Sequence, residues 1–204
     1  MLAAASARGD EAPFRPEDQV DVTQVDRHLI AVVGSGVPPV ETDLELGEYV
    51  VALRSQGFVG VIATNRRLLA VRSQGADFAE LRYRIAEKPV QPDAIHVLDR
   101  LAVAELGTRL VGFTIENTNW VSLGLGPGEK PRRIEADGGN IAVLVTPRRA
   151  IAFGSRSSSF VEETLLPEED VERVSTSDAS ITLVLPNKIL IFHNGDGRWT
   201  SLIR

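Results

Sequence analysis

The chain contains no cysteine among its 204 residues. Disulfides, thiolate catalysis and cysteine-ligated zinc or iron–sulfur sites are therefore excluded, and stability has to come from packing. Aromatic residues are scarce at 5%, although hydrophobic residues make up 43% of the chain. The core must then consist mainly of aliphatic side chains. Because valine and isoleucine favour strands, this composition favours β structure.

Positive charge is also in short supply. The 22 Lys and Arg residues are outnumbered by 28 Asp and Glu residues, so the formal net charge is −6. Such a chain is poorly suited to broad contact with a phosphate backbone, and we expect no nucleic-acid partner. No apolar run reaches the roughly 18 residues that a membrane-spanning helix needs, so we predict no membrane span.

Residues 1–18 are expected to form an N-terminal extension. Its Ala-rich start, residues 1–7, ends in a small-x-small pattern like a signal-peptidase site, but it lacks a basic start and a full apolar region. Two interpretations stay open: the remnant of an export signal followed by a first strand, or a frayed terminus. The predicted localisation is accordingly either cytoplasmic or exported.

One unit of about 40 residues recurs five times. Each copy begins with a basic or potentially basic residue followed by four apolar residues. We call these basic residues the origin residues: His28, Arg67, Arg109, Arg149 and Lys188. The steps 28→67, 67→109, 109→149 and 149→188 are 39, 42, 40 and 39 residues. This even spacing predicts a single repeat domain over residues 19–204.

An aromatic residue lies eleven places after four of the five origin residues. These positions are Phe78, Trp120, Phe160 and Trp199, and the first copy has Pro39 instead. Sugars stack on exposed aromatic rings, which is the alternative interpretation. A residue that recurs in nearly every unit is usually a core residue, however, so we predict equivalent buried places between units.

Each unit has the pattern of four strands, which we name A to D. Strand C begins at the origin residue, and strand B is the apolar run before it. Tight turns separate B from C, at residues 26–27, 65–66, 107–108, 147–148 and 186–187. A further strand precedes B in most copies, at residues 49–54, 132–136 and 171–175.

Four successive apolar positions in every C strand require burial on both faces of the sheet. The third of these positions is mostly small, as expected where two sheets approach closely: Ala31, Ala70, Gly112, Ala152 and Ile191. We therefore predict an all-β protein, a five-bladed β-propeller of four-stranded antiparallel blades. The alternatives are two small β domains that divide near residues 126–128, or an open repeat array.

In this architecture the sequence resembles the β-propeller repeat proteins. The likeness is closest to the five-bladed class, which includes tachylectin-type lectins and some sugar-cleaving enzymes. It carries no specific family motif, because the Gly-His and Trp-Asp signatures of the WD repeat are absent. The resemblance implies that the B–C and D–A connections share the face that most often binds ligands.

The origin residues would then recur along one rim as a cationic ring. Such a ring suits a protein partner with an acidic surface, and we predict a non-enzymatic binding or scaffolding protein that uses this rim. The alternative is structural: each cation pairs with an acid thirteen places on in its own blade, such as Glu41, Glu80 or Glu162. A second candidate function is multivalent carbohydrate binding through the polar C–D loops.

No catalytic motif or cofactor fingerprint appears in the sequence, and the three histidines have no metal-ligand spacing. We predict no catalytic residue, no metal and no cofactor. The resemblance to five-bladed glycosidases leaves a hydrolase as the remaining alternative, with Asp21, Glu105 and Glu135 as candidate funnel acids. Glu105 is the most unusual of them, because it flanks an otherwise apolar strand.

Overall fold

The computed structural model describes residues 19–204 apart from 35, 132, 138, 158 and 167–168, and it describes the backbone alone for residues 133–137. The predicted N-terminal extension, residues 1–18, lies outside the described residues. Nineteen strands occur in the described part, together with a single 3-10 turn, η2 (Pro92–Ala94). Within the same residues no helix is long and apolar enough to cross a membrane.

The strands form five antiparallel sheets in chain order. The first sheet has three strands: β1 (Asp21–Val25), β2 (His28–Val32) and β3 (Val40–Asp43). The second has four: β4 (Val50–Gln56), β5 (Val59–Thr64), β6 (Arg67–Arg72) and β7 (Ala79–Arg82). The third consists of β8 (Ile95–Val97), β9 (Leu101–Glu105), β10 (Arg109–Thr114) and β11 (Val121–Gly124).

The last two sheets repeat the same order. The fourth contains β12 (Arg133–Asp137), β13 (Ile141–Val145), β14 (Arg149–Gly154) and β15 (Val161–Thr164). The fifth contains β16 (Arg173–Thr176), β17 (Ser180–Val184), β18 (Lys188–His193) and β19 (Arg198–Ile203). Each origin residue begins a C strand, as predicted, and every four-stranded sheet runs A to D without a crossover.

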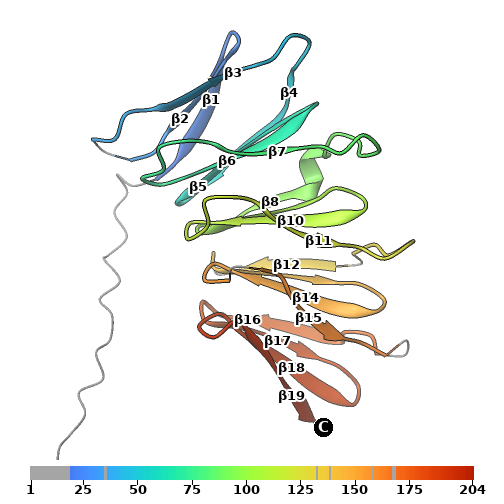
Figure 1. Ribbon diagram of the computed structural model, residues 1–204. Helices are drawn as coiled ribbons and strands as arrows, with labels where there is room; N and C mark the ends of the chain where they lie inside the picture. The colour runs from blue at the N-terminus through green and yellow to red at the C-terminus, as the bar shows by residue number, and fades with distance from the viewer. Residues whose placement is uncertain (1–18, 35, 132, 138, 158, 167–168) are drawn as a thin grey trace, which may run out of the picture.

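Figure 1 shows how these five blades are arranged. They lie face to face in chain order, with β1–β3 at one end of the row and β16–β19 at the other. The five antiparallel blades of the predicted propeller are confirmed. The first and last blades lie apart, so the blades form an open row in which each inner sheet is covered on both faces.

Four hydrophobic clusters fill the spaces between successive sheets of the described residues. The cluster between the third and fourth sheets joins Leu101 and Val103 to Leu144 and Phe153. It spans the point near residues 126–128 where two separate β domains would have divided. The doubly buried C strands follow from this stacking, since β10 is buried at all six positions.

The small third position of the C strand is used as predicted. A Cβ atom added to Gly112 would lie 2.6 Å from the Phe153 ring of the next blade, which is too close for any side chain. Ala70 and Phe113 share one cluster, and Ala152 and Phe192 share another. A small residue on one sheet therefore makes room for a large one on the following sheet.

Candidate functional site

The D–A loops, which connect the last strand of one blade to the first strand of the next, lie on the same side as the B–C turns. They span residues 44–49, 83–94, 125–132 and 165–172. In Figure 1 they lie mainly along the right-hand side, whereas the A–B turns and C–D loops lie on the left. This is the face on which the cationic rim is predicted.

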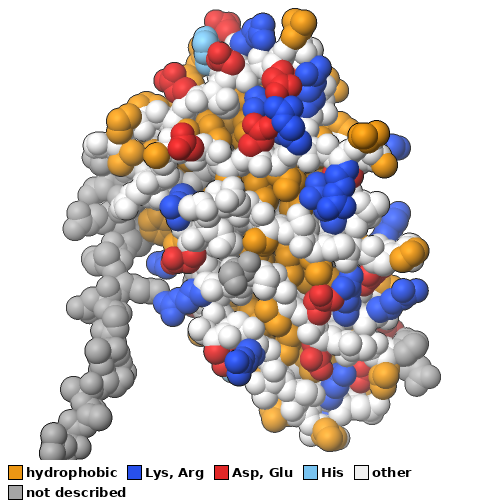
Figure 2. Space-filling view, viewed as in Figure 1, with side chains coloured by type: hydrophobic (Ala, Val, Ile, Leu, Met, Phe, Trp, Pro, Cys, Tyr) orange, Lys and Arg blue, Asp and Glu red, His pale blue; other side chains and the backbone are white. Residues whose placement is uncertain are grey.

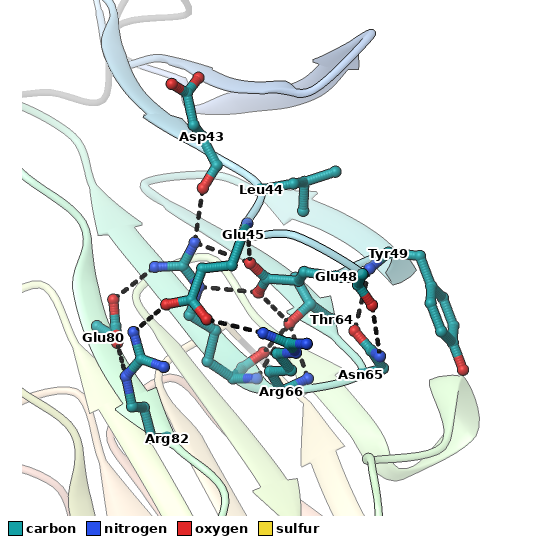
Figure 3. Close-up of polar contacts among 12 residues, drawn as sticks. Asp43, Leu44, Glu45, Glu48, Tyr49, Thr64, Asn65, Arg66, Glu80 and Arg82 are labelled. Atoms are coloured by element: carbon teal, nitrogen blue, oxygen red, sulfur yellow. Dashed lines mark hydrogen bonds and ion pairs between the residues drawn. The ribbon is translucent and has the colours of Figure 1, made fainter.

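Arg67 shows how an origin residue is placed on this face, and its partners Glu48, Glu80 and Asp43 are labelled in Figure 3. The residue is buried at 5% exposure. Its Nε and Nη2 atoms donate to the two carboxylate oxygens of Glu48 at 2.9 and 3.1 Å, and Nη1 donates to Glu80 at 2.6 Å. The Thr64 hydroxyl donates to Glu48 at 2.6 Å. Arg67 and Glu48 thus form a bidentate ion pair, the strongest type of charged hydrogen bond between side chains.

The same pairing recurs in the next three blades. Arg109 donates to both oxygens of Glu87 at 2.7 and 2.9 Å, and Arg149 donates to both oxygens of Glu129 at 2.8 Å. Lys188 lies 3.0 Å from Glu169. We call these carboxylates the anchor glutamates: Glu48, Glu87, Glu129 and Glu169. All four are side chains of D–A loops, so each of these four origin residues holds the loop that enters its own blade.

Each anchor glutamate also closes a four-residue turn of its loop. Its backbone N–H donates to the carbonyl three residues earlier, at 2.9 to 3.0 Å in the four loops. Its carboxylate in turn accepts the backbone N–H of that same earlier residue, Glu45, Arg84, Gly126 or Leu166, at 2.7 to 2.8 Å. The loop backbone and the ion pair therefore fix one another.

Burial raises the pKa of Glu48, Glu87 and Glu129, but the Arg partners and the turn N–H groups outweigh it and hold each pKa below its ordinary value. For Glu129 the pKa falls from 4.5 to about 2. At Glu169 the N–H of Leu166 contributes most to the lowering, and Lys188 adds to it. All four anchor glutamates are thus charged near neutral pH.

These depressed pKa values predict the acid stability of the protein. A carboxyl whose pKa is lower in the folded than in the unfolded chain stabilises the fold above its unfolded pKa, and this stabilisation is lost as pH falls through the folded value. The free energy of unfolding should therefore decline between about pH 4.5 and about pH 2. Urea denaturation at a series of pH values measures it. The Glu129→Gln variant should be less stable than wild type at pH 7, and its free energy of unfolding should change less with pH. An unchanged dependence of that free energy on pH would contradict the assignment.

The origin residues Arg67 and Arg149 also connect their blades to the preceding ones. The Nη2 atom of Arg67 donates to the carbonyl of Asp43 at 2.8 Å, and that of Arg149 donates to the carbonyl of Gly124 at 2.8 Å. Both carbonyls belong to the last residue of the previous D strand. At these two junctions the rim is therefore joined by hydrogen bonds between blades as well as lined by charges.

His28 differs from the other origin residues. It is exposed, and its Nδ1 atom lies 2.6 Å from Asp43 in the same sheet. In the structural alternative, each origin residue pairs with an acid thirteen residues later in its own blade. This pairing is found for Arg67 with Glu80 and for Arg149 with Glu162. Ser122 occupies that position for Arg109, at 3.1 Å. Direct contact of the five origin residues with a partner stays a prediction, and the ion pairs of Arg67, Arg109 and Arg149 with buried carboxylates favour an indirect role for those three.

The anchor glutamates were not predicted from the sequence. A signal for them was present, because a Glu precedes the origin residue by 19, 22, 20 and 19 places in the last four copies (48→67, 87→109, 129→149, 169→188). The variable spacing hides this recurrence. The residues also lie in loops, where no apolar periodicity marks them.

Exposed apolar side chains lie at the tips of these loops. Leu46 (85% exposed) and Ile85 occupy the second position of their turns, and exposed Pro127 occupies the same position in the third loop. Tyr49 and Leu166 are also exposed on D–A loops. In Figure 2, hydrophobic side chains protrude along the right-hand edge among Lys and Arg side chains. Eight large hydrophobic side chains are exposed in the described residues, and four of them are on these loops.

Basic side chains surround the apolar tips. Lys88 and Lys130 directly follow anchor glutamates, and Arg66 and Arg148 directly precede origin residues; all four are exposed. Arg66 lies 3.1 Å from Glu45. We call the apolar tips and these basic residues together the loop-tip surface.

The candidate funnel acids lie on different sheets. Asp21 is exposed on β1 and accepts a hydrogen bond from Ser55 at 3.3 Å. Glu105 is half-buried at the end of β9, where burial raises its pKa against the opposing effect of Lys130. The side chain of Glu135 lies outside the described residues.

The five repeated blades define the chain as a β-propeller-type repeat protein. Models of known protein families and curated protein sequences give no match. Solved structures with a similar fold include Kluyveromyces lactis Hsv2, at 10% identity and a TM-score of 0.41, with 92% of this chain and 72% of that one covered. The N-terminal domain of Nup159 is another, at 12% identity and a TM-score of 0.38, with 94% and 62% covered. A third is YCF48 bound to D1 peptide, at 15% identity and a TM-score of 0.36, with 92% and 66% covered.

Proposed function

We propose that the protein is a non-enzymatic scaffold that binds an acidic protein partner through the loop-tip surface. The observation that carries this proposal is the recurrence of exposed apolar residues at the tips of successive D–A loops. An exposed apolar side chain is unremarkable when it stands alone, whereas a row of them on one face is typical of an interaction surface. Repeat proteins commonly bind through such extended faces.

The buried ion pairs explain how such a surface could bind well. A loop that is already fixed before binding loses little conformational entropy when the partner arrives. In this proposal the origin residues Arg67, Arg109, Arg149 and Lys188 act on the partner indirectly, by holding the anchor glutamates and thereby the loop tips. His28 has no such loop partner among the described residues, and its exposed imidazole would contact the partner directly.

The chemistry of the partner follows from what surrounds the tips. Leu46, Ile85 and Leu166 suit an apolar stripe, and the neighbouring Lys88, Lys130 and Arg148 suit carboxylates. An amphipathic segment with acidic residues beside apolar ones satisfies both. Electrostatic attraction at such a rim speeds association and weakens with added salt.

The test is a triple variant, Leu46→Ser/Ile85→Ser/Leu166→Ser, compared with wild type in recovery of proteins from the source cell. Recovery of the specific partner should fall by about tenfold or more, because a few apolar residues usually contribute most of the binding free energy. All three side chains are exposed, so the melting temperature should stay unchanged. The matched control is Ile203→Ser, an exposed apolar position on the last strand. Equal recovery by both variants would refute the proposal.

A second candidate, carbohydrate binding, has one observation in its favour. A hollow of about 350 Å³ lies beside the C–D loops of the second and third blades and is lined by Asp77, Phe78, Asn117 and Asn119. Amide and carboxylate groups next to an aromatic ring suit a sugar. A glycan array distinguishes this function from the first, since the loop-tip variant would leave sugar binding intact.

A further inference from the structure

The two end blades each present one sheet face that no described sheet covers. Four of the eight exposed large hydrophobic side chains are on the loop-tip surface, and three of the other four lie on these uncovered faces: Val25, Val32 and Leu202. In the inner blades both faces of the B and C strands are packed against neighbours. The outer faces of the first and last blades thus interrupt a packing pattern that holds everywhere else in the row.

The strand register identifies the outer face of the first blade. Val22, Leu29 and Ala31 pack toward the second blade, so the alternating residues point away from it. Cross-strand pairs on this outer face are Asp21 with Val32, Thr23 with Ile30, Ile30 with Glu41, and His28 with Asp43. Ile30 and Val32 form its apolar centre, and the acids surround them.

The outer face of the last blade follows by the same argument. Ile181, Leu183, Leu190 and Phe192 pack toward the fourth blade. The opposite face carries three cross-strand rows, namely Arg173–Val184–Ile189–Leu202, Ser175–Thr182–Ile191–Thr200 and Ser180–His193–Arg198. Leu202 is 50% exposed and Val184, Ile189 and Ile191 are half-buried, although each has aliphatic character.

We infer that these two faces bind each other between copies of this chain, so that the last blade of one copy stacks on the first blade of the next. The charges on the two faces favour contact between a first face and a last face over contact between two identical faces. The outer strand residues of the first blade include Asp21, Glu41 and Asp43, whereas those of the last include Arg173 and Arg198. Two first faces, or two last faces, would bring like charges together.

Packing supports it as well. The residues of the last outer face occupy repeat positions that contact the following blade inside the row: Ile189 corresponds to Leu68, and Ile191 to Ala70. The residues of the first outer face occupy repeat positions that, in the inner blades, contact the preceding blade. Val32 corresponds to Val71, which packs against the first blade. Inside the row, a small residue at the third apolar position of one C strand makes room for a large residue at the fourth position of the next C strand. Gly112 makes room for Phe153 in this way. Here the larger Ile191 would meet Val32, which is smaller than phenylalanine, so the combined volume is similar.

The experiment uses one disruptive substitution on each of the two faces. Val32→Arg alters the first face alone and Ile191→Arg the last face alone, and sedimentation velocity of the full chain follows assembly over a range of concentrations. Wild type should form dimers and longer species as concentration rises, because head-to-tail contacts leave a free end. Each variant alone should stay monomeric over at least about a hundredfold in concentration, since burying a long charged side chain among the apolar residues of a sheet contact is strongly unfavourable.

An equimolar mixture of the two variants provides the decisive result. Each retains one intact face, so the mixture should form a one-to-one dimer that grows no further. Leu46→Arg on the loop-tip surface serves as the control and should assemble like wild type, which separates this inference from the proposed function. A monomeric wild type, assembly of either variant alone, or a mixture that stays monomeric would each overturn the inference. Both side chains lie on an uncovered face, so unchanged melting temperatures should confirm that the variants fold.

Discussion

Replacing Arg67 with leucine is expected to lower the free energy of unfolding by about 3–5 kcal/mol. The substitution leaves the Glu48 carboxylate buried without its partner, and an uncompensated buried charge is far more unfavourable than a lost surface contact. It also removes the hydrogen bond to the carbonyl of Asp43 that joins the first two blades. Chemical denaturation followed by circular dichroism measures the change.

The neighbouring residue provides the matched control. Arg66 also pairs with a glutamate, but its side chain is 43% exposed, compared with 6% for Arg67. Arg66→Leu should therefore change stability by only about 0–1 kcal/mol. Adding Glu48→Gln to Arg67→Leu should recover part of the loss, because the buried charge is then removed as well. If the two arginine variants cost the same, the buried pair does not have the role assigned to it.

This comparison shows which part of the site was accessible from the sequence. The origin residues could be found because they begin strands whose apolar pattern repeats, and the pairing with Glu80 follows from antiparallel register. Glu48 could not be assigned, since its contact depends on how a loop folds back over the sheet. The exposed tip residue Leu46 was missed for a related reason: in sequence, an apolar residue in a loop does not differ from one that is buried.

The fold itself was largely predictable, because strand periodicity and repeat spacing are local properties. One strand was missed, β8 (Ile95–Val97), which is short and follows the longest D–A loop, residues 83–94. The separation of the first and last blades was also beyond local reasoning. It depends on how each sheet packs against the next, as at Gly112 and Phe153, and such packing between distant strands is not visible in any one strand.

The second large loss of stability is expected when the packing between blades is disturbed at Trp120. Trp120→Ala should lower the free energy of unfolding by about 3–5 kcal/mol, because it leaves a cavity in a tightly packed cluster. The indole is buried against Phe113, with ring centroids 5.7 Å apart. Its Nε1–H also donates to the carbonyl of Ala79 in the preceding blade at 3.0 Å. The recurring aromatic position is therefore buried as predicted at Trp120 and Phe160, whereas Phe78 and Trp199 are only half-buried.

Two further variants separate the contributions of ring and hydrogen bond. Trp120→Phe keeps an aromatic ring but loses the N–H, and it should cost less than Trp120→Ala, although the unpaired carbonyl adds about 1–3 kcal/mol to the lost packing. Trp199 makes the equivalent bond to Val161 at 3.1 Å but is only half-buried in the last blade. Trp199→Ala should accordingly destabilise less than Trp120→Ala in urea denaturation. An unchanged melting temperature for Trp120→Ala, together with loss of sugar binding on a glycan array, would contradict the core assignment and favour carbohydrate binding at this position.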